Sequence, residues 1–138
     1  MAIKTLVQIR RMEIHRDFLW ALPRKRFDIC DVASKRECGT VACVAGWVPF
    51  VPQFRRAGFK PCLVCSDGYD FKYKGEWTSI MSEAAWFFGL TEEERNDLFY
   101  PESYKRRWNA TPKDAAKKLD KIIKQARKER LAAGLKVK

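Results

Sequence analysis

Apolar residues recur every three or four positions in several parts of the chain, the spacing that places them on one face of a helix. In residues 3–22 this face is formed by Ile3, Val7, Ile14 and Phe18, and the proline at position 23 ends the stretch. We therefore predict a first helix over residues 3–22.

The second half of the chain contains three more helical stretches with recognisable ends. Residues 78–90 carry a heavy apolar load, and Gly89 suits a helix C-terminus. Thr91 and Glu94 have the spacing of a capping box, which predicts a short helix that ends before Pro101. Thr111 is a favourable N-cap, and it is followed by proline at the first helical position. We predict the last helix at about 112–133.

The segment 40–50 is apolar on all sides, which favours a buried helix. We expect Thr40 to cap it and its small residues, Gly46 among them, to let another element approach closely. We expect Val44 and Trp47 to anchor it against the helix at 78–90.

Residues 62–73 alternate in a way that indicates a β-hairpin. Asp67 and Gly68 are typical of a two-residue turn, which would pair position 64 with 71 and 62 with 73. Two strands alone are marginally stable, so the hairpin needs helices or a third strand beside it. The sequence thus predicts an α+β fold, mainly helical, with about five helices and one small β-hairpin at about 62–73, in a single domain of residues 1–138.

The charge is uneven along the chain. There are 28 lysines and arginines against 17 aspartates and glutamates, a net charge of +11. Residues 101–138 hold thirteen basic and four acidic residues, so they carry +9 of this charge. Such a field attracts polyanions: nucleic acid, an acidic protein surface or anionic lipid.

The C-terminal basic face is the candidate binding site, because aromatic side chains among cations can stack on bases while the cations meet phosphates. The alternative is a solvated helix face, with Tyr104 and Trp108 packed on the core. A basic helix also suits an acidic protein partner. The residues that we predict to make contacts are Arg106, Arg107, Trp108, Lys117, Lys121, Lys124 and Lys128.

A cysteine enzyme is a further hypothesis. Cys38 or Cys43 near a helix N-terminus would have a lowered pKa, but a nucleophile also needs a base. The one histidine, His15, is flanked by Arg16 and Asp17, which favours an exposed position. Because the chain also lacks a glycine-rich phosphate loop and a paired-carboxylate motif, we expect a protein without catalytic residues and without a cofactor.

Four cysteines, Cys38, Cys43, Cys62 and Cys65, could supply the thiolates of a structural zinc site. The predicted hairpin register argues against it, because it places Cys62 and Cys65 on opposite faces of one strand. For Cys38 and Cys43, small buried thiols are the simpler interpretation.

Bulk features favour a cytoplasmic protein. No apolar run approaches the roughly 20 residues of a membrane span. The first twenty residues alternate apolar and charged positions, unlike a signal peptide, and five cysteines are an odd number that cannot all pair internally.

The stretch 38–47, CGTVACVAGW, resembles a Cys-Gly-Thr-x-x-Cys-x-Ala-Gly-Trp signature found in small uncharacterised phage and bacterial proteins. Residues 84–91 and 98–101 resemble its usual downstream partner. The resemblance covers about a quarter of the chain and implies no established activity. It implies a phage-type accessory role, in the bacterial host cytoplasm or as a virion component.

The leading functional hypothesis is therefore a basic, non-catalytic phage-type protein that binds nucleic acid or a nucleic-acid-handling complex. The alternative is a protein–protein module, either an inhibitor of a host or defence factor or a virion component, that binds an acidic protein surface. The third is a cysteine hydrolase that uses Cys38.

Overall fold

The structure is a computed structural model that describes residues 3–37, 39–63 and 68–138. Its fold is α+β and mainly helical, as predicted, with two small antiparallel sheets beside the helices. Within these residues, no helix is both long enough and apolar enough to cross a membrane.

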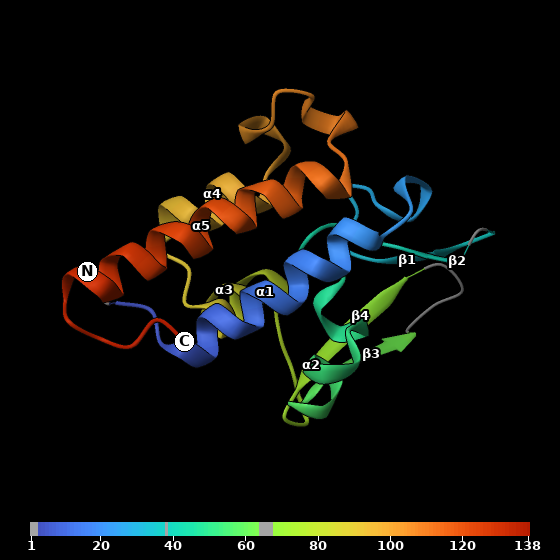
Figure 1. Ribbon diagram of the computed structural model, residues 1–138. Helices are drawn as coiled ribbons and strands as arrows, with labels where there is room; N and C mark the ends of the chain where they lie inside the picture. The colour runs from blue at the N-terminus through green and yellow to red at the C-terminus, as the bar shows by residue number, and fades with distance from the viewer. Residues whose placement is uncertain (1–2, 38, 64–67) are drawn as a thin grey trace.

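Two long helices form one side of the molecule. They are α1 (Leu6–Ala21) and α5 (Pro112–Ala132), which lie side by side along most of their length (Figure 1). The shorter helices α3 (Ile80–Phe88) and α4 (Glu92–Phe99) pack against this pair, and α2 (Pro52–Arg56) lies beside the sheet.

Local sequence signals explain where these helices begin and end. In both α4 and α5 the N-cap threonine accepts a hydrogen bond from the backbone three residues on, and the acidic side chain there accepts one from the threonine N–H. The pairs are Thr91 with Glu94 and Thr111 with Asp114. Gly89 ends α3 in the left-handed conformation, as predicted.

The strands form a two-stranded and a three-stranded sheet. The first pairs β1 (Ser34–Arg36) with β2 (Gly39–Val41), which the sequence did not predict. The second has the order β3 (Phe59–Leu63), β4 (Tyr69–Tyr73) and β5 (Glu76–Trp77), so a third strand supports the hairpin.

The predicted hairpin register is wrong by three residues. Cys62 pairs with Asp70 and Leu63 with Tyr69, so the connection runs from 64 to 68 instead of over two residues. Phe59 instead lies opposite Tyr73, and their rings are 4.5 Å apart between centroids. The Asp67 position of the expected turn lies outside the described residues.

The predicted helix at 40–50 is also wrong. Thr40 lies in β2, the following residues form turns, and a short 3₁₀ helix, η2 (Val48–Phe50), completes the segment. The reason is non-local: the N–H of Ala42 bonds to Arg26 O, and that of Cys43 bonds to Asp31 O, so neither joins a helical ladder. The expected burial is correct, because residues 41–49 are all buried; we call them the buried 41–49 segment.

The expected close approach occurs at Gly46, but its neighbour is not a helix. A Cβ at this position would lie 1.5 Å from the carbonyl oxygen of Val32. Trp47 does not anchor on α3 either: its indole N–H donates to Arg26 O at 3.0 Å, and its ring packs against Phe18.

The buried face of α1 differs from the predicted one. Its buried residues are Ile9, Met12, His15 and Leu19, whereas Val7 is exposed. The expected exposure of His15 is wrong, because its side chain is fully buried. Its Nε2 donates to Val44 O at 2.8 Å, and this single polar contact lets a neutral imidazole join an otherwise apolar face.

Candidate nucleic-acid interface

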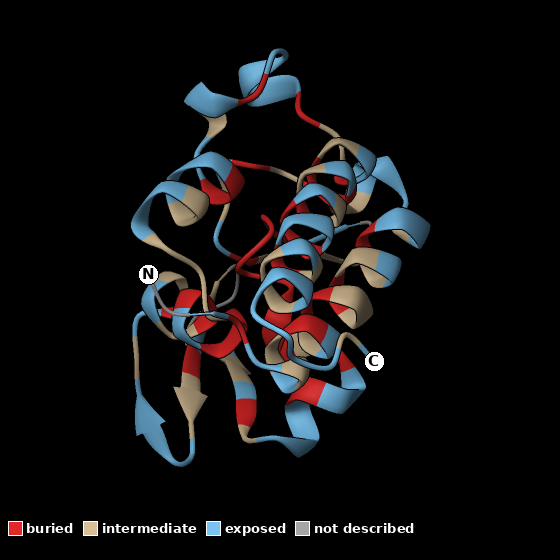
Figure 2. Cartoon of the chain, turned by 60° about the vertical axis from the view of Figure 1, so that its left-hand side comes forward, coloured by how far each residue is buried: buried red, intermediate tan, exposed pale blue. Residues whose placement is uncertain are grey.

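Four of the predicted contact residues form a row along the outer face of α5. Lys117, Lys121, Lys124 and Lys128 follow one another at intervals of four, three and four residues, which keeps them on one side of a helix. All four are exposed, and the opposite face of α5 is buried (Figure 2). We call these four residues the α5 lysine row; at 1.5 Å per residue it is about 16 Å long.

Most of the charge in this row is uncompensated. Lys124 Nζ lies 2.9 Å from Asp120 Oδ2, and this contact, together with Arg16, holds the pKa of the Asp120 carboxyl below its usual range. Lys117, Lys121 and Lys128 form no ion pair with any residue that the structure describes. Three ammonium groups are therefore open to an external anion.

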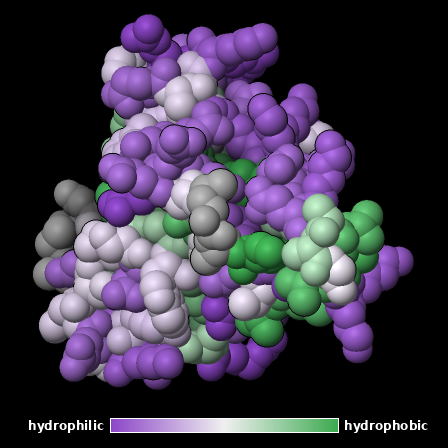
Figure 3. Space-filling model, turned by 90° about the vertical axis from the view of Figure 1, so that its left-hand side faces the viewer, coloured by the Kyte–Doolittle hydropathy of each residue, from purple (hydrophilic) through white to green (hydrophobic). Residues whose placement is uncertain are grey.

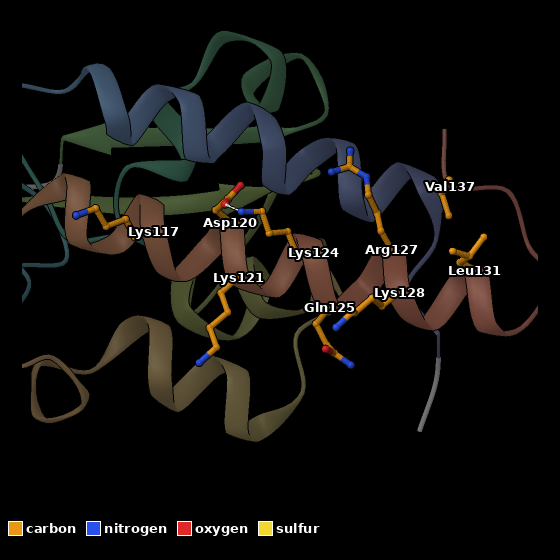
Figure 4. A pocket seen from close by; sticks show the side chains of 9 residues that line it. All are labelled: Lys117, Asp120, Lys121, Lys124, Gln125, Arg127, Lys128, Leu131 and Val137. Atoms are coloured by element: carbon orange, nitrogen blue, oxygen red, sulfur yellow. Dashed lines mark ion pairs between the residues drawn. The ribbon is translucent and has the colours of Figure 1, made fainter.

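A groove of about 830 Å³ runs beside the row (Figure 4). Asp120 and Arg127 extend toward α1, where Arg127 Nη2 meets Glu13 Oε2 at 2.6 Å, whereas Lys121 extends away from α1. Leu131 and Val137 line the far end of the groove. The groove is thus basic along the lysine row and apolar at the end of α5.

The other three predicted contacts lie before the first turn of α5. Arg107 and Trp108 belong to a short 3₁₀ helix, η4 (Arg107–Asn109), and Arg106 directly precedes it. This helix lies in the segment between α4 and α5 that projects from the body of the molecule (Figure 1). All three side chains are exposed, Trp108 by 59%. The structure therefore places them at the N-terminal end of α5, next to the lysine row rather than within it.

Tyr104 and Trp108 differ in burial, although the sequence analysis gave both the same two alternatives. The Tyr104 hydroxyl donates to Leu98 O at 2.5 Å and its ring is buried. Lys118 Nζ lies 4.2 Å from the ring centroid and 2.7 Å from Asp97 Oδ1. Tyr104 thus packs on the core, whereas Trp108 is open to a ligand.

Sequence reasoning missed Trp20, the second exposed indole beside this face. Trp20 lies in the last turn of α1 and is 50% exposed, and Lys113 Nζ lies 5.1 Å from its ring centroid. The available signal was a large aromatic residue that does not belong to the predicted apolar face of its helix.

Cys43 lacks the surroundings of a nucleophile. Cys43 is buried, and burial raises the pKa of its thiol to about 11. Burial also lowers the pKa of His15 to about 4, and its ring packs among Phe18, Phe54 and Phe88. Cys38 lies outside the described residues, so its role as a nucleophile stays a hypothesis.

The zinc hypothesis also depends partly on residues that the structure does not describe. Among the residues with described positions, no cluster of three or more histidine, cysteine, aspartate or glutamate side chains is arranged to hold a metal ion. Cys38 and Cys65, half of the proposed ligand set, lie outside those residues.

No protein-family model, curated protein or solved structure matches this chain. The resemblance to phage and bacterial proteins therefore stays a prediction, and the functional argument depends on the chemistry of the site.

Proposed function

We propose that this protein is a non-catalytic nucleic-acid-binding protein that holds the phosphate backbone along the α5 lysine row. The observation that carries the proposal is the row itself: three ammonium groups without a described ion-pair partner on one exposed helix face. At about 3.4 Å of rise per nucleotide, a row about 16 Å long spans roughly five nucleotides of one strand.

The residues before α5 extend this surface. Arg106 and Arg107 add two exposed guanidinium groups, which suit phosphate oxygens. Trp108 adds an exposed indole, and aromatic rings amid cations are the usual arrangement in proteins that bind nucleic acid without reading sequence. The proposal therefore predicts charge-driven binding with little sequence preference.

The test is fluorescence anisotropy of the full chain with labelled duplex DNA, single-stranded DNA and RNA, each titrated over salt. If the five open cations meet phosphates, the slope of log K against log salt is about −3.5 for a single strand and about −4.5 for a duplex. Raising the salt from 50 to 200 mM then weakens binding about a hundred-fold to about five hundred-fold.

Two variants with the same change in net charge test whether the α5 lysine row is the binding surface. The triple variant Lys117→Glu, Lys121→Glu and Lys128→Glu removes the open cations of the row. The control, Arg55→Glu, Arg56→Glu and Lys60→Glu, changes the net charge equally at exposed residues of α2 and β3. We expect the first variant to lose binding and the control to weaken it modestly. Equal losses, or no binding of the native protein to any probe at low salt, would overturn the proposal.

One observation favours a second candidate, an acidic protein partner. Leu131 is 69% exposed at the apolar end of the groove, and hydrophobic side chains gather at one edge of this otherwise hydrophilic end of the molecule (Figure 3). An acidic amphipathic helix could place its apolar side on Leu131 and its carboxylates on the lysines. Such an interface depends on apolar anchors, so its salt dependence is shallow.

A further inference from the structure

A second hollow lies between α1 and α5, next to the lysine row. It has a volume of about 420 Å³, which is within the range of small-ligand sites, and Lys117 borders both this hollow and the groove of the row. The residues that line it are Arg16, Asp17, Trp20, Ala116, Lys117 and Asp120.

We propose that this hollow takes one unpaired nucleobase, stacked on Trp20, and that the ligand of the protein is single-stranded nucleic acid. The inference rests on the proposed function, because it assumes that the backbone of the same strand follows the α5 lysine row.

The stacking surface is the indole of Trp20. Half of this residue is exposed. Ala116, which also lines the hollow, is almost fully buried and carries only a methyl group, so no large side chain from that position fills the space beside the indole. Base–aromatic stacking is tolerant of sequence because every base has a π-face. Trp20 can therefore accept any base that enters the hollow.

Two lysines lie close to the indole. Lys113 Nζ lies over the ring, 5.1 Å from its centroid, so a base stacks on the part of the indole that this side chain leaves open, and Lys117 lines the hollow one helical turn further along α5. One turn is about 5.4 Å, which at about 3.4 Å of rise corresponds to between one and two nucleotides of a strand. A base on Trp20 would thus have its flanking phosphates near these two ammonium groups.

The polar rim of the hollow is held in place by its own ion pairs. Arg16 Nη1 lies 2.8 Å from Asp120 Oδ1, and Arg16 Nε lies 3.1 Å from Asp17 Oδ1. This rim offers carboxylate oxygens to the exocyclic amino groups of adenine or cytosine. The same ion pairs reduce the repulsion of a phosphate by the two carboxylates, because Arg16 meets both Asp17 and Asp120 and Lys124 also meets Asp120.

The geometry favours a single strand over a duplex. In a duplex each base is stacked and paired, and its extrusion costs free energy that an unpaired base does not require. The same lysine row would meet the phosphates of either ligand, so the preference arises at the exposed indoles, and the Trp20 variants measure the share that this hollow supplies. The inference consequently separates the contribution of Trp20 from that of the lysines.

The test compares Trp20→Ala and Trp20→Leu with the native protein, by anisotropy at fixed salt with labelled single-stranded DNA, single-stranded RNA and duplex DNA of equal length. Trp20→Leu keeps apolar packing at the end of α1 without a π-face. The matched control is Trp86→Ala, which removes an indole that is 63% exposed on α3, beside Tyr73 and Trp77 and outside the lining of both hollows on α5. A melting curve for each variant verifies folding.

We expect single strands to bind more tightly than the duplex, and both Trp20 variants to weaken single-strand binding roughly 5- to 150-fold. The salt slope should stay unchanged in these variants, since stacking releases no counterions. Duplex binding and the Trp86→Ala control should change little. The DNA and RNA probes show which strand chemistry the hollow accepts.

Other outcomes separate the two proposals. Single-strand binding that is lost in the lysine-row variant but unaffected by both Trp20 variants would overturn this inference and leave the proposed function intact. Duplex binding as tight as single-strand binding would also overturn it. Absence of binding to every probe would overturn both.

Discussion

The buried 41–49 segment and the α5 lysine row treat their polar groups in opposite ways. In the buried segment the backbone carbonyl of Val44 accepts from His15, and the N–H of Gly46 is directed at the Cys43 sulfur at 3.4 Å. In the lysine row three ammonium groups have no partner among the described residues. One region uses its polar atoms to hold the fold, and the other leaves them open to an external ligand.

This difference corrects an impression that the sequence gives. The stretch 38–47, with its two cysteines, glycines and tryptophan, looks like the chemical centre of the chain, but its described residues serve packing. The lysine residues without an ion pair lie instead on α5, much later in the chain. Most buried polar groups are satisfied within a fold, so binding capacity depends on the exposed groups that the fold leaves without a partner.

Gly46→Ala should have the largest effect on stability. The new Cβ would lie 1.5 Å from Val32 O, so the backbone of one segment must move. We expect a loss of about 3 kcal/mol or more in the free energy of unfolding, measured by urea denaturation. The control is Gly134→Ala, which meets no atom within 4 Å and has only the cost of a left-handed φ of 74°, about 1 kcal/mol. Equal losses in the two variants would mean that the 41–49 segment is not packed as described.

His15 should make stability depend on pH between about 4 and 6.5. Burial lowers its pKa in the folded protein to about 4, so below pH 6.5 the unfolded chain binds a proton that the folded one does not. The free energy of unfolding should therefore fall as the pH decreases through this window, by up to roughly 3 kcal/mol from this group.

The variant His15→Gln isolates this contribution, since an amide can donate to Val44 O but does not titrate. We expect the stability difference between the native protein and His15→Gln to shift by that amount between pH 6.5 and 4, in urea titrations at each pH. A difference that is constant across the window would show that His15 is not buried in its neutral form.

The lysine-row triple variant should have the smallest effect on stability. Lys117, Lys121 and Lys128 are exposed and without a described ion pair, so their replacement by glutamate should change the free energy of unfolding by no more than about 0.5 kcal/mol. Urea denaturation of the variant, beside its loss of binding, would complete the contrast with Gly46→Ala. A loss above about 1 kcal/mol would show that the row supports the fold.

The parts of the fold that the sequence predicted depend on residues close together in the chain. Thr91 with Glu94 and Thr111 with Asp114 satisfy each other across three residues, and Gly89 ends its helix through its own backbone. The last helix was also placed correctly, at about 112–133, because its N-cap threonine and the following proline are neighbours in the chain. The lysine row follows from the period of the same helix.

The parts that failed depend on distant contacts. The segment 40–50 is apolar on all sides, so periodicity could not separate a helix from a buried turn, and its hydrogen bonds to Arg26 and Asp31 decided the outcome. The hairpin register was set by the pairing of Phe59 with Tyr73, outside the expected range.

By itself, the sequence determined the helical class, the helix ends after residue 78 and the concentration of charge in the C-terminal helix, because each depends on local propensity or on composition. Only the tertiary structure decided that His15 is buried, that Tyr104 packs inside while Trp108 stays outside, and that Trp20 lies beside Lys113. These outcomes depend on which segments pack together: His15 meets Val44 only when the buried 41–49 segment packs on α1, and Trp20 meets Lys113 only when α1 packs on α5.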